Sequence, residues 1–219
     1  IDKLSYLYNL RRLGIKTGLG HTLELLSCCS NPHEKLQIIH IAGTNGKGST
    51  STMVSSILRS AGYKVGLYTS PHLIRFNERI TIDGKCISDD EIELFVNKYK
   101  KDIDEISSTF FETTTAMAFT HFANENVDFA VIEVGLGGRL DSTNVVNPKI
   151  TAITPISLDH KDILGDNLLS IAREKAGIIK KNIPVVIGHQ EKNIKSYLHG
   201  VANTNSSPAI DIEVINDVN

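Results

Sequence analysis

A lysine flanked by glycines follows a short apolar run. Residues 38–42 are Ile-Ile-His-Ile-Ala, and the next eight are Gly43, Thr44, Asn45, Gly46, Lys47, Gly48, Ser49 and Thr50. Glycines let the backbone turn tightly and approach a ligand closely. Backbone N–H groups at the start of a following helix attract an anion, and a lysine adds a positive charge for terminal phosphates. The stretch predicts a phosphate-binding loop, with a hydroxyl of Ser49 or Thr50 in reach of Mg²⁺.

The loop departs from the usual phosphate-loop pattern at two positions. The pattern G-x-x-x-x-G-K-[ST] requires a glycine where Ile41 stands, and a hydroxyl residue directly after Lys47, where Gly48 stands. The alternative interpretation of the same residues is an ordinary glycine-rich turn between a strand and a helix.

Polar side chains follow three other apolar runs. Residues 128–134 predict a buried parallel strand that carries Glu133, and buried glutamates are rare unless paired or metal-bound. Ser70 and His72 follow a strand over 64–68, while Asp159 and His160 follow a strand over 150–154. In doubly wound sheets, ligands bind at the carboxyl ends of the strands. The alternative is structural: a turn at Pro71, and a lone histidine without a ligand.

A second lysine, Lys175, lies in a helical pattern over 167–181. One apolar stripe, Leu168, Ile171, Ala172 and Ile179, places Lys175 toward the core, where a charge must be paired or chemically altered. A competing stripe with Leu169 and Ala176 leaves Lys175 at its margin, where its ammonium reaches water. The sequence leaves both open, as it does a structural ion pair between Arg139 and Asp141.

The elements that must position these groups alternate along the chain. Strands are expected over 38–42, 64–68, 128–134, 150–154 and 184–187, with helices between them, and this order predicts a doubly wound, mostly parallel α/β sheet. Residues 80–87 predict a small β-hairpin around Asp83-Gly84. Ser88 and Glu91 form a capping box for a helix over 89–101, and another helix over 109–124 follows. In the helix after the loop, Thr50, Met53, Val54, Ile57, Leu58 and Ala61 are expected to share the buried face.

Composition restricts the class of protein. The 219 residues carry a net charge of −2, which argues against a broad nucleic-acid-binding surface. Cys28, Cys29 and Cys86 lack metal-site spacing and indicate reduced thiols in a cytoplasmic protein. No apolar run approaches the ~20 residues of a membrane span, and no signal peptide is expected.

Five stretches of the chain together resemble one enzyme family. They are residues 43–49, 69–73 (Thr-Ser-Pro-His-Leu), 76–80 (Phe-Asn-Glu-Arg-Ile), 133–144 and 158–160 (Leu-Asp-His). In this order they resemble the folylpolyglutamate synthases and dihydrofolate synthases of the Mur ligase superfamily. The resemblance extends over residues 4–190 or so. It is far more specific than the glycine loop alone.

The resemblance implies an ATP-dependent amide ligase. ATP converts a carboxylate of a folate or dihydropteroate to an acyl phosphate, which the amine of L-glutamate attacks. Residues 43–50 would hold the nucleotide, and Ser49, Glu133 and Ser70 a first Mg²⁺. His160 and a lysine at position 175, commonly carbamylated by CO₂ in this family, would serve a second ion, although imidazole suits Mg²⁺ less well than oxygen does. The family also allows a potassium ion. The substrate residues implied are Thr109, Phe110, Phe111 and Asp141; the two phenylalanines are equally well explained as core.

The sequence also predicts how the chain divides into domains. Residues 1–190 are expected to form the ATP-binding domain, and 191–219 a tail, linker or start of further structure, with a possible edge strand at Ile210 and Ile212. The resemblance also implies a C-terminal glutamate-ligase domain, for which no pattern is seen in these residues, so this chain alone is expected to ligate poorly. A monomer is expected. The alternatives are a muramyl-type amino-acid ligase, or an inactive nucleotide-binding fragment.

Overall fold

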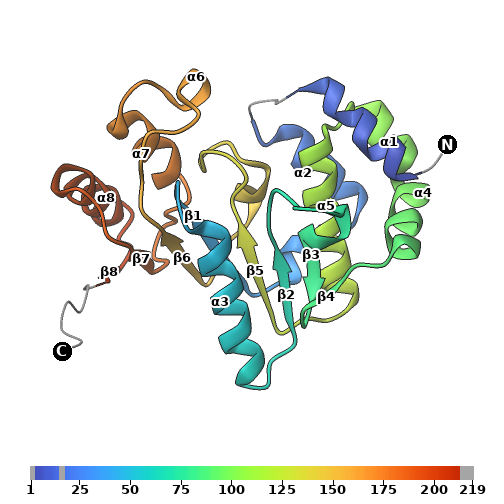
Figure 1. The fold of residues 1–219 in the computed structure, drawn as a ribbon, viewed down its shortest axis with the longest axis horizontal. Helices are drawn as coiled ribbons and strands as arrows, with labels where there is room; N and C mark the ends of the chain where they lie inside the picture. Colours follow the sequence, from blue (N-terminus) through green and yellow to red (C-terminus); the bar gives the residue numbers. More distant parts are fainter. Residues whose placement is uncertain (1–2, 15–17, 213–219) are drawn as a thin grey trace.

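A single eight-stranded sheet organises the protein (Figure 1). The structure is a computed structural model that describes residues 3–14 and 18–212. The strand order is β4-β3-β2-β5-β1-β6-β7-β8, and every neighbouring pair from β2 to β8 is parallel. The strands are β1 (Ile38–Ala42), β2 (Val65–Tyr68), β3 (Ile80–Ile82), β4 (Lys85–Cys86), β5 (Phe129–Glu133), β6 (Ile150–Ile153), β7 (Val185–Ile187) and β8 (Ala209–Asp211). The predicted doubly wound, mostly parallel α/β fold is confirmed.

Helices connect the strands and cover the sheet. They are α1 (Lys3–Asn9), α2 (Gly20–Cys28), α3 (Lys47–Ser60), α4 (Asp89–Ile106), α5 (Phe110–Asn124), α6 (Lys161–Leu164), α7 (Leu168–Ala176) and α8 (Lys192–Thr204). Short 3₁₀ turns lie at η1 (Leu10–Leu13), η2 (Pro32–Lys35), η3 (Phe76–Arg79) and η4 (Ser142–Val145). No helix among the described residues is long and apolar enough to span a membrane.

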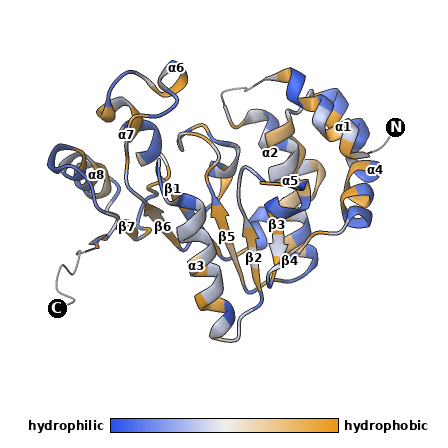
Figure 2. Ribbon diagram, viewed as in Figure 1, coloured by the Kyte–Doolittle hydropathy of each residue, from blue (hydrophilic) through white to orange (hydrophobic). Residues whose placement is uncertain are grey.

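The core divides into layers because successive strand residues face opposite sides of the sheet. Ile41, Val65 and Val131 pack against Val54 and Leu58 of α3, which lies in front of the sheet in Figure 1. The larger clusters lie on the other side, where α1, α2, α4 and α5 pack over one half and α7 and α8 over the other. In Figure 2 the strands are mostly apolar, and the helices that cover them are of mixed hydropathy.

Local signals in the sequence are confirmed at the hairpin and at two helix starts. Asp83 and Gly84 both have positive φ, at 51° and 79°, as a two-residue turn between antiparallel strands requires. The Ser88 hydroxyl accepts the Glu91 N–H, so α4 begins in the predicted capping box. The side chain of Thr109 caps α5 in the same way.

Two expectations about helices are wrong. In α3, Met53 and Ile57 are 58% and 68% exposed, and Ser51 and Ser55 are buried instead, because the helix contacts the sheet along a face centred on Val54 and Leu58. The helix expected over 167–181 ends at Ala176, before Gly177.

Residues after 191, expected to form a tail, a linker or the start of further structure, are ordered into a helix and a strand in the described part of the chain. They add α8, whose Ile194, Leu198 and Ala202 are buried, and the strand β8, which pairs with β7. The spacing of these three residues is helical. The strand expected near Ile210 is confirmed as β8, which extends the sheet at its edge.

Candidate functional site

The glycine loop joins the carboxyl end of β1 to the start of α3. Gly43 has φ of 149°, and a Cβ there would lie 1.8 Å from Thr154 Oγ1, so only glycine fits. Gly46, at φ 81°, precedes the first residue of α3, and no side chain caps that helix. The Thr44 N–H donates to the Pro155 carbonyl at 3.0 Å. The loop is therefore held in place while the first N–H groups of α3 are left for another acceptor.

Side chains of the loop stay close to it. Lys47 folds back so that its ammonium donates to the Thr44 carbonyl at 3.1 Å. Asn45 Nδ2 donates to the Ser157 hydroxyl at 2.9 Å. Ser49 is exposed in the first turn of α3. The arrangement suits an anion at the helix start with Lys47 as the nearest positive charge.

Glu133 lies beside the start of α3. It is 4% exposed, and its Oε2 accepts the Ser70 N–H at 3.0 Å. A Cβ at Gly48 would lie 3.5 Å from the same oxygen. Burial raises the pKa of Glu133, while the Ser70 N–H and the charges of Lys47 and Arg79 oppose that rise. A buried carboxylate beside a phosphate-type loop is chemically suited to a hard divalent cation.

Lys175 faces the core, which decides between the two stripes. It is 4% exposed on α7, and its Nζ donates to the Gly43 carbonyl at 2.7 Å. Burial, together with the charge of Lys47, lowers the pKa of Lys175 to about 8. Much more neutral amine is therefore present near neutral pH than on an ordinary lysine, and the neutral amine is the form that reacts with CO₂.

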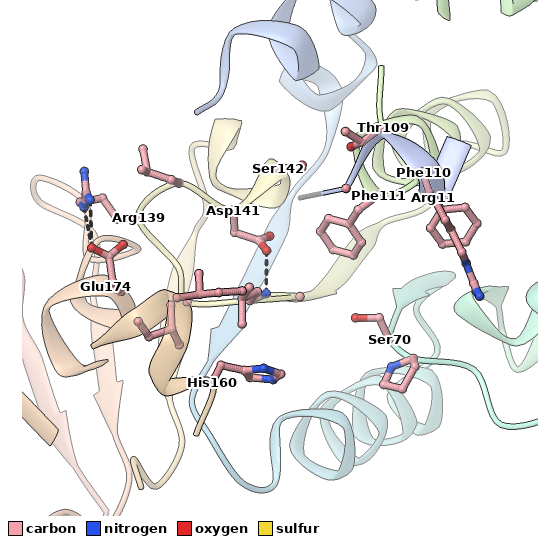
Figure 3. Close-up of a pocket in the computed structure, with 18 of the residues that line it drawn as sticks. Arg11, Ser70, Thr109, Phe110, Phe111, Arg139, Asp141, Ser142, His160 and Glu174 are labelled. Atoms are coloured by element: carbon pink, nitrogen blue, oxygen red, sulfur yellow. Dashed lines mark hydrogen bonds and ion pairs between the residues drawn. The ribbon is translucent and has the colours of Figure 1, made fainter. Parts of the chain in front are cut away.

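A cavity of about 520 Å³ opens at the same edge of the sheet (Figure 3). Phe110 and Phe111 from the start of α5 form its apolar wall, with Ser70 below them in the figure and His160 across from Ser70. Phe110 is 8% exposed and stacks on Tyr8 with ring centroids 5.9 Å apart, so it serves both core and cavity. Phe111 fills the space over Gly135, where a Cβ would lie 2.3 Å from the ring.

Asp141 supplies the buried acid of the cavity. Its Oδ2 accepts the Leu136 N–H at 2.8 Å, and its Oδ1 accepts the Thr143 N–H at 3.0 Å. Burial raises the pKa of Asp141, and these hydrogen bonds oppose that rise. The structural alternative, an ion pair between Arg139 and Asp141, is not formed. Arg139 pairs instead with Glu174, at 2.9 Å.

The sequence matches a known protein family. Residues 41–214 match the Mur ligase middle domain. The chain belongs to the Mur ligase family. A dihydrofolate synthase/folylpolyglutamate synthase of Bacillus subtilis is 43% identical over 214 residues, which are 94% of this chain and 50% of that protein. The chain thus spans about half the length of the curated relatives it matches.

Solved structures of Mur ligase relatives have the same fold. A folylpolyglutamate synthase from Thermotoga maritima aligns with a TM-score of 0.86 and 43% identity, over 95% of this chain and 48% of that chain. The E. coli FolC structure, solved in complex with DHPP and ADP, aligns with a TM-score of 0.89 and 35% identity, over 96% of this chain and 51% of that one.

Some of the expected metal ligands lie close together in the structure, and others do not. Ser70 and Glu133 are in contact, as described above. His160 is exposed at the cavity rim, and its nearest acidic partner is Asp159 at 3.6 Å. Within residues 3–14 and 18–212, no three His, Cys, Asp or Glu side chains form a metal-type cluster. The ligand set Ser49, Ser70, Glu133 and His160 stays a prediction.

Two site residues of this Mur ligase domain were not assigned from sequence. Arg11 and Arg79 line the cavity, with their guanidinium carbons 4.8 and 5.2 Å from the centre of the Phe110 ring. Arg79 is buried and donates to His72 Nδ1 at 2.8 Å. Arg79 lies in the Phe-Asn-Glu-Arg-Ile motif, which could have singled it out, whereas Arg11 carries no local signal.

Proposed function

We propose that this chain is the nucleotide- and pteridine-binding part of an ATP-dependent ligase that joins L-glutamate to a folate or to dihydropteroate. The observation that supports this proposal most is the contact between the cavity and the glycine loop. Ser70 lines the cavity and donates its N–H to Glu133, which lies against the first turn of α3. A substrate in the cavity would therefore lie next to phosphates held at the loop.

The residues fit the proposed ligands. Gly43, Gly46 and the uncapped start of α3 suit the phosphates of ATP, with Lys47 neutralising their charge. Ser49, Ser70 and Glu133 offer oxygen ligands for Mg²⁺, and His160 or a carbamylated Lys175 would serve a second ion. Bound ATP supplies the phosphoryl group that activates the substrate carboxylate. The potassium ion, the monomeric state and the cytoplasmic location stay predictions.

The lining of the cavity suits a pteridine ring. Phe111 offers an apolar ring face for stacking, and Asp141 offers an acceptor for ring N–H and amino groups. Thr109 contributes a polar edge beside them. The whole ligase reaction is proposed for the longer protein that the relatives represent, since this chain spans about half of them. Within this chain, the residues bind and orient ATP and the pteridine-bearing substrate.

The first test is nucleotide affinity. We expect Lys47→Ala to weaken MgATP binding at least about tenfold, because a charge-assisted contact to phosphate is lost. Isothermal titration calorimetry on the 219-residue chain measures it. Lys101→Ala is the matched control, since Lys101 is exposed on α4 and pairs with Glu105 along the helix. Equal affinity in wild type and Lys47→Ala would remove the phosphate-loop assignment.

The second test identifies the substrate. ADP release by the longer protein should require both L-glutamate and either dihydropteroate or a tetrahydrofolate. Release that depends instead on a nucleotide-linked muramyl substrate would favour a muramyl ligase. Nucleotide binding without ADP release on any of these substrates would favour an inactive nucleotide-binding protein.

A further inference from the structure

A buried hydrogen-bond chain links the strand before the phosphate loop to the acid of the cavity. His40 Nε2 lies 2.8 Å from Thr143 Oγ1, and Thr143 Oγ1 lies 2.5 Å from Asp141 Oδ1. His40 and Thr143 are 0% exposed, and Asp141 is 6% exposed. Asp141 lines the cavity, whereas His40 and Thr143 do not. The two inner residues can influence a ligand only through Asp141.

The chemistry of the three groups determines where the protons lie. Burial raises the pKa of Asp141, but its carboxylate accepts N–H groups from Leu136 and Thr143, and these donors favour the ionised form. The single hydroxyl proton of Thr143 then points to Asp141. Its oxygen must accept a proton from His40, so Nε2 of His40 carries the hydrogen.

The surroundings of His40 agree with a neutral ring in that tautomer. Nδ1 of His40 is buried and has no hydrogen-bond partner. Burial, with the nearby charge of Lys180, lowers the pKa of His40 to about 3. The ring therefore keeps a single N–H. The strand β1 holds it in place, with His40 in register between Ile132 of β5 and Thr151 of β6.

We propose that His40 and Thr143 are positioning residues that fix the orientation and the acceptor state of Asp141 for the donor groups of a pteridine. Asp141 is presented to the cavity as an ionised acceptor in one rotamer, because its inner oxygen is occupied by Thr143. The choice of pteridine as ligand rests on the proposed function; the proton arrangement does not. An acceptor fixed in this way loses little rotational freedom when the ligand binds.

The decisive variants are Thr143→Val, which removes the hydroxyl, and Thr143→Ser, which keeps it. We expect Thr143→Val to weaken dihydropteroate binding about tenfold, since a donor to a charged group is lost and the carboxylate of Asp141 is then held by its backbone N–H donors alone. Thr143→Ser should bind within about threefold of wild type. Binding is measured by calorimetry on the 219-residue chain, with ATP affinity measured in parallel. Thr151→Val is the matched control, because it removes another fully buried hydroxyl, one that donates to the Pro184 carbonyl.

A second measurement does not depend on any ligand. ¹⁵N NMR of the histidine rings should show His40 as the Nε2–H tautomer, and ¹³C NMR should show a higher pKa for Asp141 in Thr143→Val than in Thr143→Ser. An Nδ1–H tautomer, or an Asp141 titration that Thr143→Val leaves unchanged, overturns the inference. So does an equal loss of dihydropteroate affinity in Thr143→Ser, or a parallel loss of ATP affinity, since both indicate general damage to the fold. A wild-type chain that binds no dihydropteroate overturns the proposed function, and the two spectra then decide the positioning of Asp141 by themselves.

Discussion

Lys175 lies in the core of α7 with its ammonium on the Gly43 carbonyl, 2.7 Å away. A cation in such a place is destabilised relative to water, and one hydrogen bond to a neutral carbonyl compensates it only in part. The neutral amine is favoured to the same extent. Burial disfavours the charged forms of Glu133 and Asp141 as well, and because these are acids it raises the pKa of each. Three buried ionisable residues with shifted pKa values thus lie around one loop and one cavity.

Stability should therefore depend on pH through Lys175. The folded pKa is about 8 and the ordinary value 10.5, so between these pH values the unfolded chain holds a proton that the folded chain does not. Stability then rises with pH. We expect the wild type to gain about 2 kcal/mol relative to Lys175→Met between pH 7 and pH 10. Urea unfolding in buffer purged of CO₂ measures it. A constant difference between the two proteins over this range would contradict the assignment.

At the scale of elements, close contacts decide which glycines are essential. β2 packs directly against α5, and a Cβ at Gly66 would lie 2.7 Å from the Phe122 ring, which is fully buried. The ring has no free space to move into, because interiors are closely packed. Gly200 in α8 differs, since a Cβ there meets nothing within 4 Å. The same residue type therefore has opposite consequences in the two elements.

These two glycines make a matched pair of variants. Gly66→Ala should destabilise the protein by about 1–3 kcal/mol through overpacking. Gly200→Ala should leave stability unchanged or raise it by up to about 1 kcal/mol, because alanine favours a helix. Urea unfolding at one pH measures both. Equal effects of the two substitutions would show that the β2–α5 contact is looser than described.

At the scale of the whole molecule, the crossovers of the sheet bring distant segments to one edge. The loop after β1, Ser70 after β2, Glu133 at the end of β5 and the residues after β6 all lie at the carboxyl ends of parallel strands. Helix α7 then brings Lys175 back to Gly43, across 132 positions of the sequence. Binding at this edge should consequently stabilise the entire sheet.

Nucleotide should therefore raise the melting temperature. At an ATP concentration of about 100 times Kd, binding adds roughly 2.7 kcal/mol, which corresponds to a rise of about 5–10 °C for a chain of this size. AMP, which lacks the terminal phosphates, should give a much smaller rise, and Lys47→Ala should abolish most of the ATP effect. Differential scanning fluorimetry with Mg²⁺ measures these shifts. An equal rise with AMP and ATP would place the nucleotide elsewhere.

Local sequence signals determined much of this protein without its structure. Periodicity and turn residues predicted the strands, the hairpin at Asp83-Gly84 and the capping box of Ser88 and Glu91, because these depend on neighbours within a few positions. The motifs around Lys47, Glu133 and Asp141 predicted the family and the candidate site. The helical spacing in α8 was also present and went unrecognised.

Tertiary structure alone decided the contacts between segments that lie far apart. Two stripes were equally compatible with the helix of Lys175, and only the position of Gly43 shows which one is buried. Arg139 could pair with Asp141 by proximity in the chain, yet Glu174 on α7 lies closer in space. The link from His40 to Thr143 joins residues 103 positions apart. Periodicity shows which face of an element is apolar, but the partner of a buried charge depends on how the elements are arranged in space.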